Sequence, residues 1–528
     1  MKRKSIFIIL LIISFACSSC GHKSKIAEDD SMRLTKNTEK LSVFTSESPY
    51  VENLDTNEFT KWYQEKTNIE IEWQISKGNL EKEKELLFSN GNYPDVIFNA
   101  DITRADQLLY GEQGILLDLA ELIDKNTIYL KEIFKNRPDI KNDITAPDGK
   151  IYGLPQINEV YHTQYPAKMW VYKPWLDTLG LKEPQTTEEF YQMLKAFKEK
   201  DPNCNGLADE IPFASTGSLG ENGYDEFLLN SFVYTRSNRL RMLNGKVDFI
   251  GDDEEYREGL RYLNRLFKEG LLYNNSLLDD RKALTKIGEN PEPILGSATA
   301  LWYGMFTEVG GDSKRYSDYV AISPLIGPKG VRQTPKYSHE GLGSQFSITN
   351  NCENPEVAIK WIDWFYSMEG TLTSQYGFKD DGWRMATPDE IGVDGNRAIW
   401  TPLDDYGTEK QNSTWQNFGT FYLDEKLRNG VSGDLTEKLM YDFTKNKYVM
   451  FGVDESVKSC FIDTSKSEEF MTISQKVDSI IKKSMMQFVS GEKSLDTDWN
   501  EYIENLNKAG INRYIEIYQE NYDRNKIS

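Results

Sequence analysis

Strand patterns alternate with helical patterns from Leu41 onward, and this alternation constrains the fold more than any other feature of the sequence. Residues 41–45 form a short apolar run, and in residues 69–75 the apolar side chains fall on every second position, as on one face of a strand. A helical pattern over residues 57–66 separates them, and residues 95–98 form a third short apolar run. Strands that alternate with helices predict an α/β fold with mainly parallel sheets.

The carboxyl ends of parallel strands are where such folds bind ligands. Ser46 and Glu47 follow the first predicted strand, and Asn99 and Asp101 follow the third. These four residues are therefore candidate ligand contacts. Each could equally be a turn or capping residue, since Ser, Asn and Asp favour both positions.

The N-terminus has the layout of a secretory leader. Three basic residues at positions 2–4 precede an apolar run over residues 6–15, and small residues lead to Cys20. The run is shorter than the roughly 20 residues that cross a bilayer as a helix. Small residues before a cysteine resemble a bacterial lipobox, which predicts a signal peptide over residues 1–19 and lipidation of Cys20. Cys17 is an alternative lipidation site, and simple cleavage to a soluble secreted protein is another outcome.

The rest of the chain is long and acidic. Residues 20–40 are polar and lack hydrophobic periodicity, which predicts a flexible tether. At 528 residues the chain is long enough for two or three domains. Its net charge of −21 and the lack of a basic stripe argue against nucleic acid as a partner. Beyond the leader only Cys204, Cys352 and Cys460 remain, so at most one disulfide can form within the chain.

Four segments occur in a characteristic order along the chain: residues 93–98, 148–155, 175–181 and 517–524. In this order they resemble the family 1 extracellular solute-binding lipoproteins of bacterial ABC importers, in particular the oligosaccharide- and alginate-binding group. The resemblance implies an α/β periplasmic-binding-protein-like fold of type II, with two lobes, a hinge and an interlobe cleft. It also implies a monomer, lipid-anchored at the extracytoplasmic face of the cell membrane, that delivers an oligosaccharide to membrane permease subunits.

The same resemblance suggests how the chain divides. The N-terminal lobe is expected to comprise residues 41–160 and 347–392, and the C-terminal lobe residues 161–346 and 393–528. Three crossings between the lobes are then expected, near residues 160–171, 344–349 and 389–400.

Residues 201–210 have the spacing of an EF-hand calcium loop. Oxygen-bearing side chains occupy loop positions 1, 3, 5 and 9, with Gly206 at position 6. The predicted ligands of a structural Ca²⁺ ion are Asp201, Asn203, Asn205, Leu207 through its carbonyl, Asp209 and Glu210. The loop departs from an EF-hand at position 12, where Pro212 replaces the usual Glu. The alternative is an ordinary Asx turn after a helix. Alginate-binding members of the family carry a similar structural calcium loop.

Aromatic residues make up 12% of the chain, and several lie in polar or Gly-rich segments. Sugar rings expose an apolar C–H face that packs on an aromatic ring, while their hydroxyls require polar partners. Trp302 and Trp415 are the first candidates for stacking platforms, followed by Trp383, Tyr303 and Tyr161. The candidate hydroxyl partners are Glu340, Asp101 and Arg384. Any one of these aromatic residues could instead belong to the core.

Nothing in the sequence indicates catalysis. The folded part contains only His162 and His339, and neither has metal-ligand spacing. A Gly-x-Ser-x-Gly nucleophile elbow is also missing. The prediction is a binding protein without enzymatic activity. The alternatives are a binding protein for peptides or another polar solute and, less favoured, a surface glycoside hydrolase.

Overall fold

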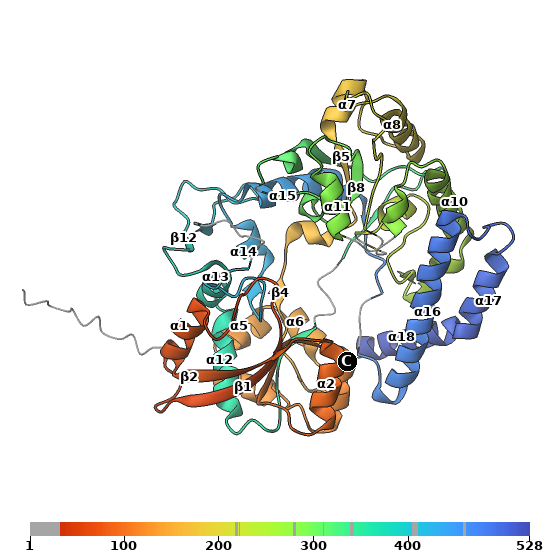
Figure 1. Ribbon diagram of the computed structural model, residues 1–528. Coiled ribbons are helices and arrows are strands. Elements are labelled where there is room, and N and C mark those ends of the chain that lie inside the picture. Colours follow the sequence, from red (N-terminus) through yellow and green to blue (C-terminus); the bar gives the residue numbers. More distant parts are fainter. Residues whose placement is uncertain are drawn as a thin grey trace, which may run out of the picture.

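The computed structural model describes residues 32–216, 220, 222–277, 281–309, 311–337, 343–403, 410–457 and 461–527. The leader with Cys17 and Cys20, as well as His339, Glu340 and Cys460, lies outside the described residues. Figure 1 shows two lobes, one below and one above, with a C-terminal group of helices at the right. Among the described residues no helix has both the length and the apolar character needed to cross a membrane.

The first lobe is built on a four-stranded sheet in the order β11-β3-β1-β2. Its strands are β1 (Glu39–Ser46), β2 (Ile69–Ser76), β3 (Val96–Ile102) and β11 (Ser344–Ile348). β1 pairs in parallel with both β2 and β3, while β11 pairs antiparallel with β3. The three strands expected from the sequence are therefore present, parallel to one another, and β11 adds an antiparallel edge.

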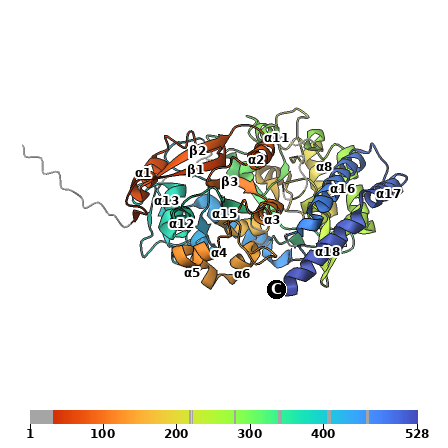
Figure 2. The same ribbon diagram turned by 90° about the horizontal axis from the view of Figure 1, so that it is seen from below.

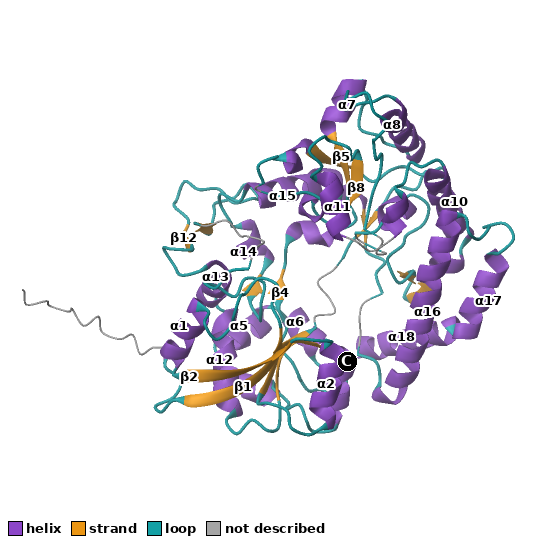
Figure 3. Ribbon diagram, in the orientation of Figure 1, coloured by secondary structure: helices purple, strands orange, loops and turns teal. Residues whose placement is uncertain are grey.

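Helices pack on this sheet and cover it (Figure 3). They are α1 (Glu58–Thr67), α2 (Leu80–Ser89), α3 (Arg104–Glu112), α4 (Ala120–Asn126), α5 (Tyr129–Asn136), α6 (Pro138–Ile144) and α12 (Pro355–Asp363). α1 begins where predicted because the Asn57 side chain accepts a hydrogen bond from the Thr60 N–H at 3.1 Å. The core under the sheet is rich in aromatic rings, among them Phe59, Tyr63 and Trp361.

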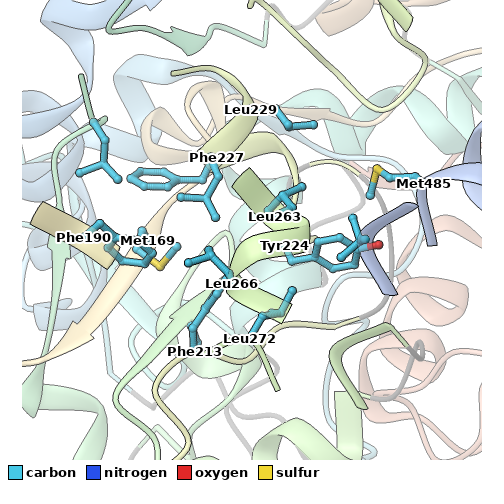
Figure 4. Packing of buried hydrophobic residues seen from close by; sticks show 14 of the residues in the cluster. Met169, Phe190, Phe213, Tyr224, Phe227, Leu229, Leu263, Leu266, Leu272 and Met485 are labelled. Carbon is cyan, nitrogen blue, oxygen red and sulfur yellow. The ribbon is translucent and has the colours of Figure 1, made fainter. Parts of the chain in front are cut away.

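The second lobe has a three-stranded sheet in the order β8-β5-β9. Its strands are β5 (Met169–Tyr172), β8 (Ser297–Thr299) and β9 (Tyr319–Ile322), and both neighbours of β5 run antiparallel to it. The expectation of mainly parallel sheets is therefore wrong for this lobe. Helix and loop segments fill the remaining volume. Figure 4 shows how Met169 of the central strand packs among side chains from several of these segments.

The helices of the second lobe include a long amphipathic pair. α10 (Glu254–Lys268) buries Tyr256, Leu260 and Leu263 on one face and packs against α16 (Thr464–Ser490). The other elements of this lobe and of the C-terminal group are α7 (Lys173–Leu179), α8 (Thr187–Glu199), α9 (Glu226–Leu229), α11 (Arg281–Gly288), α17 (Trp499–Ala509), α18 (Ile511–Ile527), β6 (Leu240–Leu243) and β7 (Lys246–Phe249). Figure 2 shows α16, α17 and α18 gathered at one end of the molecule.

A smaller apolar cluster lies between the two main cores. It contains Leu372, Trp383, Trp400 and Val431. The elements around it are α13 (Met368–Tyr376), α14 (Glu425–Asn429), α15 (Leu435–Lys447), β12 (Trp383–Met385) and β13 (Trp400–Pro402). The residues between Leu372 and Tyr441 that belong to this cluster therefore form a hydrophobic core separate from those of the two lobes.

Two short parallel strand pairs lie where the chain passes between the lobes. β4 (Ile157–Asn158) pairs with β14 (Tyr422–Leu423), and β10 (Thr334–Pro335) pairs with β15 (Gly452–Val453). Four connecting segments are thus joined two by two. We refer to these two strand pairs as the hinge.

The chain passes from one hydrophobic core to another at positions that differ in part from the predicted crossings between the lobes. The first crossing falls between Ile157 of the first core and Tyr165 of the second, which overlaps the expected segment. Residues 344–349, expected to cross, instead contain the edge strand β11 of the first lobe. Residues 389–400 belong to the small cluster, and Trp415 then returns to the first core. The boundary expected at residue 392 is therefore not where the cores change, because the chain leaves the first lobe only after β14.

The second connecting segment, which contains β10, is held to the second lobe through Tyr337. The backbone N–H of Tyr337 donates to the Gln164 carbonyl at 2.8 Å, and its hydroxyl lies 3.0 Å from both carboxyl oxygens of Glu226. The guanidinium of Arg236 lies 3.7 Å above the Tyr337 ring. Glu226 itself is fully buried. Burial, followed by the nearby carboxylate of Asp225, raises the pKa of Glu226 to about 8.

This raised pKa makes the stability of the second lobe depend on pH. The native state holds a proton on Glu226 that the unfolded chain releases, so this contribution to stability is complete below the unfolded pKa and is lost as pH rises through about 8. Glu226→Gln keeps a neutral side chain at every pH. We expect the variant to gain stability relative to the parent between about pH 5 and about pH 8, by something on the order of 1–3 kcal/mol.

Melting curves recorded across this pH range would measure the difference. Glu65→Gln, on the exposed face of α1, is the matched control and should leave the pH profile unchanged. Parallel profiles for the parent and Glu226→Gln would contradict the assignment of a protonated carboxyl at this position.

Candidate ligand-binding site and metal loop

The carboxyl ends of β1 and β3 lie side by side in the first lobe, as predicted for a ligand-binding edge. The Ser46 hydroxyl donates to the backbone carbonyl of Asn99 at 2.6 Å, and the Asn99 amide donates back to the Ser46 oxygen at 3.0 Å. The Asn99 side-chain oxygen accepts a hydrogen bond from the Gly419 N–H at 3.3 Å. Ser46 and Asn99 therefore hold two strands and a distant loop together at this edge.

Asp101 is held in a strained position beside them. Both Asn99 and Asp101 have positive φ, 46° and 50°, which side chains other than glycine seldom adopt. The buried Lys84 ammonium donates to the backbone carbonyl of Asp101 at 2.6 Å. The Asp101 side chain is exposed, and no described residue hydrogen-bonds to its carboxylate. A fixed backbone that presents an unpaired carboxylate is typical of a binding site.

Glu47, the fourth candidate at this edge, already has a partner. Its carboxylate lies 3.0 Å from the Lys410 ammonium, and the hydrogen bond from Lys410 lowers the pKa of Glu47. Both side chains are largely exposed. This ion pair brings Lys410 to the same edge of the sheet as Asp101.

The register of the sheets shows which edge of each lobe lies next to the connections. Ile102 at the end of β3 pairs with Ser344, the start of β11, where the second connecting segment enters the first lobe. Thr299 at the end of β8 pairs with Met169, the start of β5, where the first connecting segment enters the second lobe. Residues that come after β3 and β8 therefore lie on the sides of the two lobes next to the connections.

Trp302 comes after β8 on this side of the second lobe. Its side chain is partly exposed, and its ring centroid lies 5.8 Å from that of Tyr303. Its indole packs directly on Gly304, where an added Cβ would lie only 2.5 Å from the ring. The residue type at 304 thus helps to fix the orientation of the Trp302 ring.

Tyr161 lies within the first connecting segment, in the short 3-10 turn Tyr161–Gln164. Its ring centroid is 4.5 Å from that of Tyr441, and the side chain is half-buried. Burial, followed by the neighbouring Tyr441, raises the pKa of Tyr161 to about 12. Asp101, Trp302 and Tyr161 are thus the predicted site residues that lie on or beside the connections and keep exposed surface.

Three other predicted stacking residues lie in the interior, which corrects their assignment. Trp415 is 1% exposed, stacks on Phe365 at 5.1 Å, and donates its indole N–H to Thr60 at 2.7 Å. Trp383 is also 1% exposed and belongs to the small cluster. Tyr303 is 1% exposed and meets Trp170 edge-on at 5.3 Å. Rings enclosed in this way have no free face for a sugar.

Arg384, which was predicted to bind sugar hydroxyl groups, instead forms a bidentate ion pair with Glu390. Its guanidinium nitrogens lie 2.7 and 2.6 Å from the two carboxyl oxygens of Glu390. The hydrogen bonds from Arg384 lower the pKa of Glu390 to about 2. The pair braces the segment between β12 and β13. The sequence did not indicate this pair, although its members are only six residues apart, because that spacing matches no regular helix or strand period; the partners of Lys410 and Tyr337 are distant in the sequence.

The predicted calcium loop comes after α8, as expected, and folds around Asp201. The two Asp201 carboxyl oxygens accept hydrogen bonds from the N–H groups of Asn205 at 3.1 Å and Gly206 at 3.0 Å. The Asn205 side-chain oxygen accepts from the Leu207 N–H at 2.7 Å. Positive φ values at Asp201, Cys204 and Gly206 give the loop its sharp turns.

The other predicted calcium ligands of the loop also lie close to one another. The amides of Asn203 and Asn205 donate to the Asp209 carboxylate at 3.1 and 3.2 Å. Glu210 has a buried oxygen with no hydrogen-bond partner among the described residues, and burial followed by the nearby acidic groups raises its pKa. A buried, unsatisfied carboxyl oxygen beside further oxygen donors fits a hard cation such as Ca²⁺.

Amide and carbonyl oxygens are essential to such a site. In the described part of the chain, no group of three or more His, Cys, Asp or Glu side chains is close enough to hold a metal ion. Cation binding in the loop would therefore need Asn203, Asn205 and the Leu207 carbonyl besides the carboxylates.

Comparison with known proteins shows that this chain is similar to FusA over nearly its full length. FusA of Streptococcus pneumoniae, named a fructooligosaccharide ABC transporter substrate-binding protein, is 27% identical over 541 residues, which cover 98% of this chain and 97% of FusA. A solved structure of FusA in complex with kestose has a TM-score of 0.80 at 24% identity and covers 92% of this chain and 99% of that one. A FusA variant described as an EF-hand mutant gives a TM-score of 0.79.

A second relative is the lipoprotein LipO of Bacillus subtilis. It is 25% identical over 266 residues, which cover 49% of this chain and 51% of LipO. The profile of the bacterial extracellular solute-binding protein family matches residues 45–372. That match spans more than half of the chain and includes β2, β3 and β11 of the first lobe, the three-stranded sheet of the second lobe and the first two connecting segments. The chain belongs to the family of bacterial extracellular solute-binding proteins.

Proposed function

We propose that this protein is the substrate-binding component of an ABC transporter, and that it captures an oligosaccharide between its two lobes for delivery to membrane permease subunits. The observation that carries the proposal is the likeness to FusA, which extends along nearly the full length of both chains. The family and the two-lobed fold agree with it.

Asp101 and Trp302 are the residues we assign to ligand binding. They belong to different lobes, and both lie at or after strands that end beside the connecting segments. The partly exposed Trp302 ring can pack on the C–H face of a sugar, and the unpaired Asp101 carboxylate can accept hydrogen bonds from hydroxyl groups. Closure at the hinge would bring the two contacts onto opposite sides of one ligand. We assign binding without turnover, because capture and release need no bond to break.

Tryptophan substitutions separate ligand binding from core packing. Trp302→Ala should weaken binding of an oligosaccharide by about 1–3 kcal/mol and lower the melting temperature less than Trp415→Ala does, because the Trp302 ring is partly exposed and packs only against the margin of the second core. Trp415→Ala should lower the free energy of unfolding by about 3–5 kcal/mol, because it opens a cavity among packed aromatic rings. Calorimetry with kestose and with neutral oligosaccharides of other linkages, together with thermal melting, measures both quantities.

The same titrations test the proposal as a whole. Unchanged affinity in Trp302→Ala would remove this residue from the site but not the proposed function. Binding of short peptides in place of every sugar would reject the oligosaccharide proposal. Smaller products in the mixture after incubation would show that the protein is an enzyme.

We also propose that the loop over residues 201–210 binds a structural Ca²⁺ ion. The support is the orphan oxygen of Glu210, the donor set around Asp209, and a relative whose structure is described as an EF-hand mutant. The ion would tie the end of α8 to residue 293, whose carbonyl accepts from the Asn203 amide at 3.3 Å. It would act as a clip in the second lobe and not as a catalytic centre.

Chelation should therefore lower the melting temperature of protein purified with calcium. An ion that binds only the native state adds about 2.7 kcal/mol when its concentration is a hundred times the dissociation constant. Asp209→Ala should remove the response to EDTA, while Asp312→Ala, an exposed acid elsewhere in the same lobe, should keep it. Identical melting with and without EDTA, on protein shown by metal analysis to carry calcium, would exclude a stabilising ion.

Finally, we propose that Cys20 carries a lipid anchor. Membership of an extracellular family and the relative named as a lipoprotein support export and anchoring. Cys20→Ser should move the protein from the membrane fraction to the soluble fraction, whereas Cys17→Ser should not. Release by Cys17→Ser alone would move the lipidation site to residue 17.

A further inference from the structure

A cavity of about 460 Å³ lies beside the hinge and includes none of the residues assigned above to ligand binding. Four segments form its walls: helix α5, the turn that leads into α13, Ile399 just before β13, and the end of β14 with α14. Figure 1 shows α5, α13 and α14 close together near β4. Its volume falls within the range of about 300–1,000 Å³ that is usual for small-molecule sites.

The bottom of the cavity is apolar. Ile133, Tyr366 and Leu427 line it from three of the four segments, and all three are buried. The Tyr366 hydroxyl already donates to the Pro155 carbonyl at 2.6 Å, so this residue offers the cavity mainly its ring. Ile133 and Tyr366 belong to the first core and Leu427 to the small cluster, so the cavity lies at the seam between two packed units.

The rim of the cavity is polar and carries charges of both signs. Tyr129, Glu132 and Asn136 line it from successive turns of α5, and Lys426 lines it from α14. Among the described residues, no side chain or backbone group hydrogen-bonds or ion-pairs with the side chains of Glu132, Asn136 or Lys426. These groups therefore offer acceptors and donors to an occupant.

The other cation of the wall is already neutralised. Arg137 makes ion pairs with Asp139 at 2.6 Å and with the buried Glu159 at 2.9 Å. Of the other charged side chains in the lining, Asp424 accepts a hydrogen bond from the Leu427 N–H at 2.8 Å as the N-cap of α14, whereas Glu132 and Lys426 are opposite in sign and have no such partner among the described residues. An occupant with a net charge would meet one favourable and one unfavourable partner, so the site favours a neutral molecule.

We propose that this cavity is a second ligand site, separate from the one between the lobes, for a neutral cyclic polyol the size of one or two sugar rings. Such a molecule has an apolar C–H face for the aromatic and aliphatic floor and hydroxyl groups for the unpaired rim. The cavity also touches the hinge, because Tyr422 lines it and belongs to β14, whose Leu423 carbonyl accepts from the Glu159 N–H at 2.8 Å. Any occupant that binds the open and closed forms differently would shift their balance.

Saturation-transfer NMR of the full exported chain with glucose and with sucrose tests the proposal. Asn136→Trp places an indole at the rim and should weaken binding of the better sugar by about tenfold or more. Lys135→Trp, on the same helix but outside the cavity lining, is the matched control and should bind like the parent. Melting curves check that both variants fold.

The variant Trp302→Ala distinguishes the two sites. The sugar signals should persist in Trp302→Ala and fall in Asn136→Trp, and Glu132→Ala with Lys426→Ala, which removes the rim acceptor and donor, should reproduce the loss without added bulk. Signals that disappear in Trp302→Ala but survive in Asn136→Trp would place all binding between the lobes and overturn the second site. Failure of both sugars to bind at concentrations up to tens of millimolar would overturn it as well.

Discussion

The pairing of short strands between the lobes is the constraint on which the other features depend. β4 with β14, and β10 with β15, are pairs of only two residues each, yet they join segments that are far apart in the sequence. Each pair contributes few hydrogen bonds, so side chains supply the remaining restraint. Glu226 and Arg236 hold Tyr337 on one side, and Arg137 and Glu159 brace the other. A weak backbone ladder with strong side-chain anchors suits a hinge, because the lobes can move while the connections keep their register.

The position of the candidate site depends on this arrangement. In the first lobe a parallel sheet directs the ends of β1 and β3 toward the connections, as the strand and helix pattern predicts. In the second lobe the sheet is antiparallel, and the end of β8 reaches the same side only because it runs opposite to β5. Two different sheet topologies therefore present Asp101 and Trp302 toward the hinge side of their lobes. The rule that ligands bind at the carboxyl ends of parallel strands accounts for the position of Asp101. The position of Trp302 follows only from the register of the antiparallel sheet.

Local features were predictable from the sequence, and long-range ones were not. The strands β1 to β3, the start of α1 after Asn57 and the loop after α8 depend on residues close in sequence, and the patterns indicated all of them. The antiparallel sheet of the second lobe and the return of Trp415 to the first core depend on contacts between distant segments. Partners such as Arg384 with Glu390 or Glu47 with Lys410 carry no spacing signal, so their charges looked free in the sequence.

The aromatic residues show most clearly why composition alone could not locate the site. Trp361, Trp415, Phe365 and Phe59 pack on one another in the first lobe, where large rings fill the space between sheet and helices. A tryptophan in a polar segment can thus turn inward, as Trp415 does through its hydrogen bond to Thr60. Trp302 differs in that it stays partly exposed, with its ring packed on Gly304 at the margin of the second core. A neighbouring glycine does not by itself indicate exposure, since Trp383 directly follows Gly382 and is 1% exposed, but at residue 304 only a residue without a Cβ permits the ring to approach the backbone this closely.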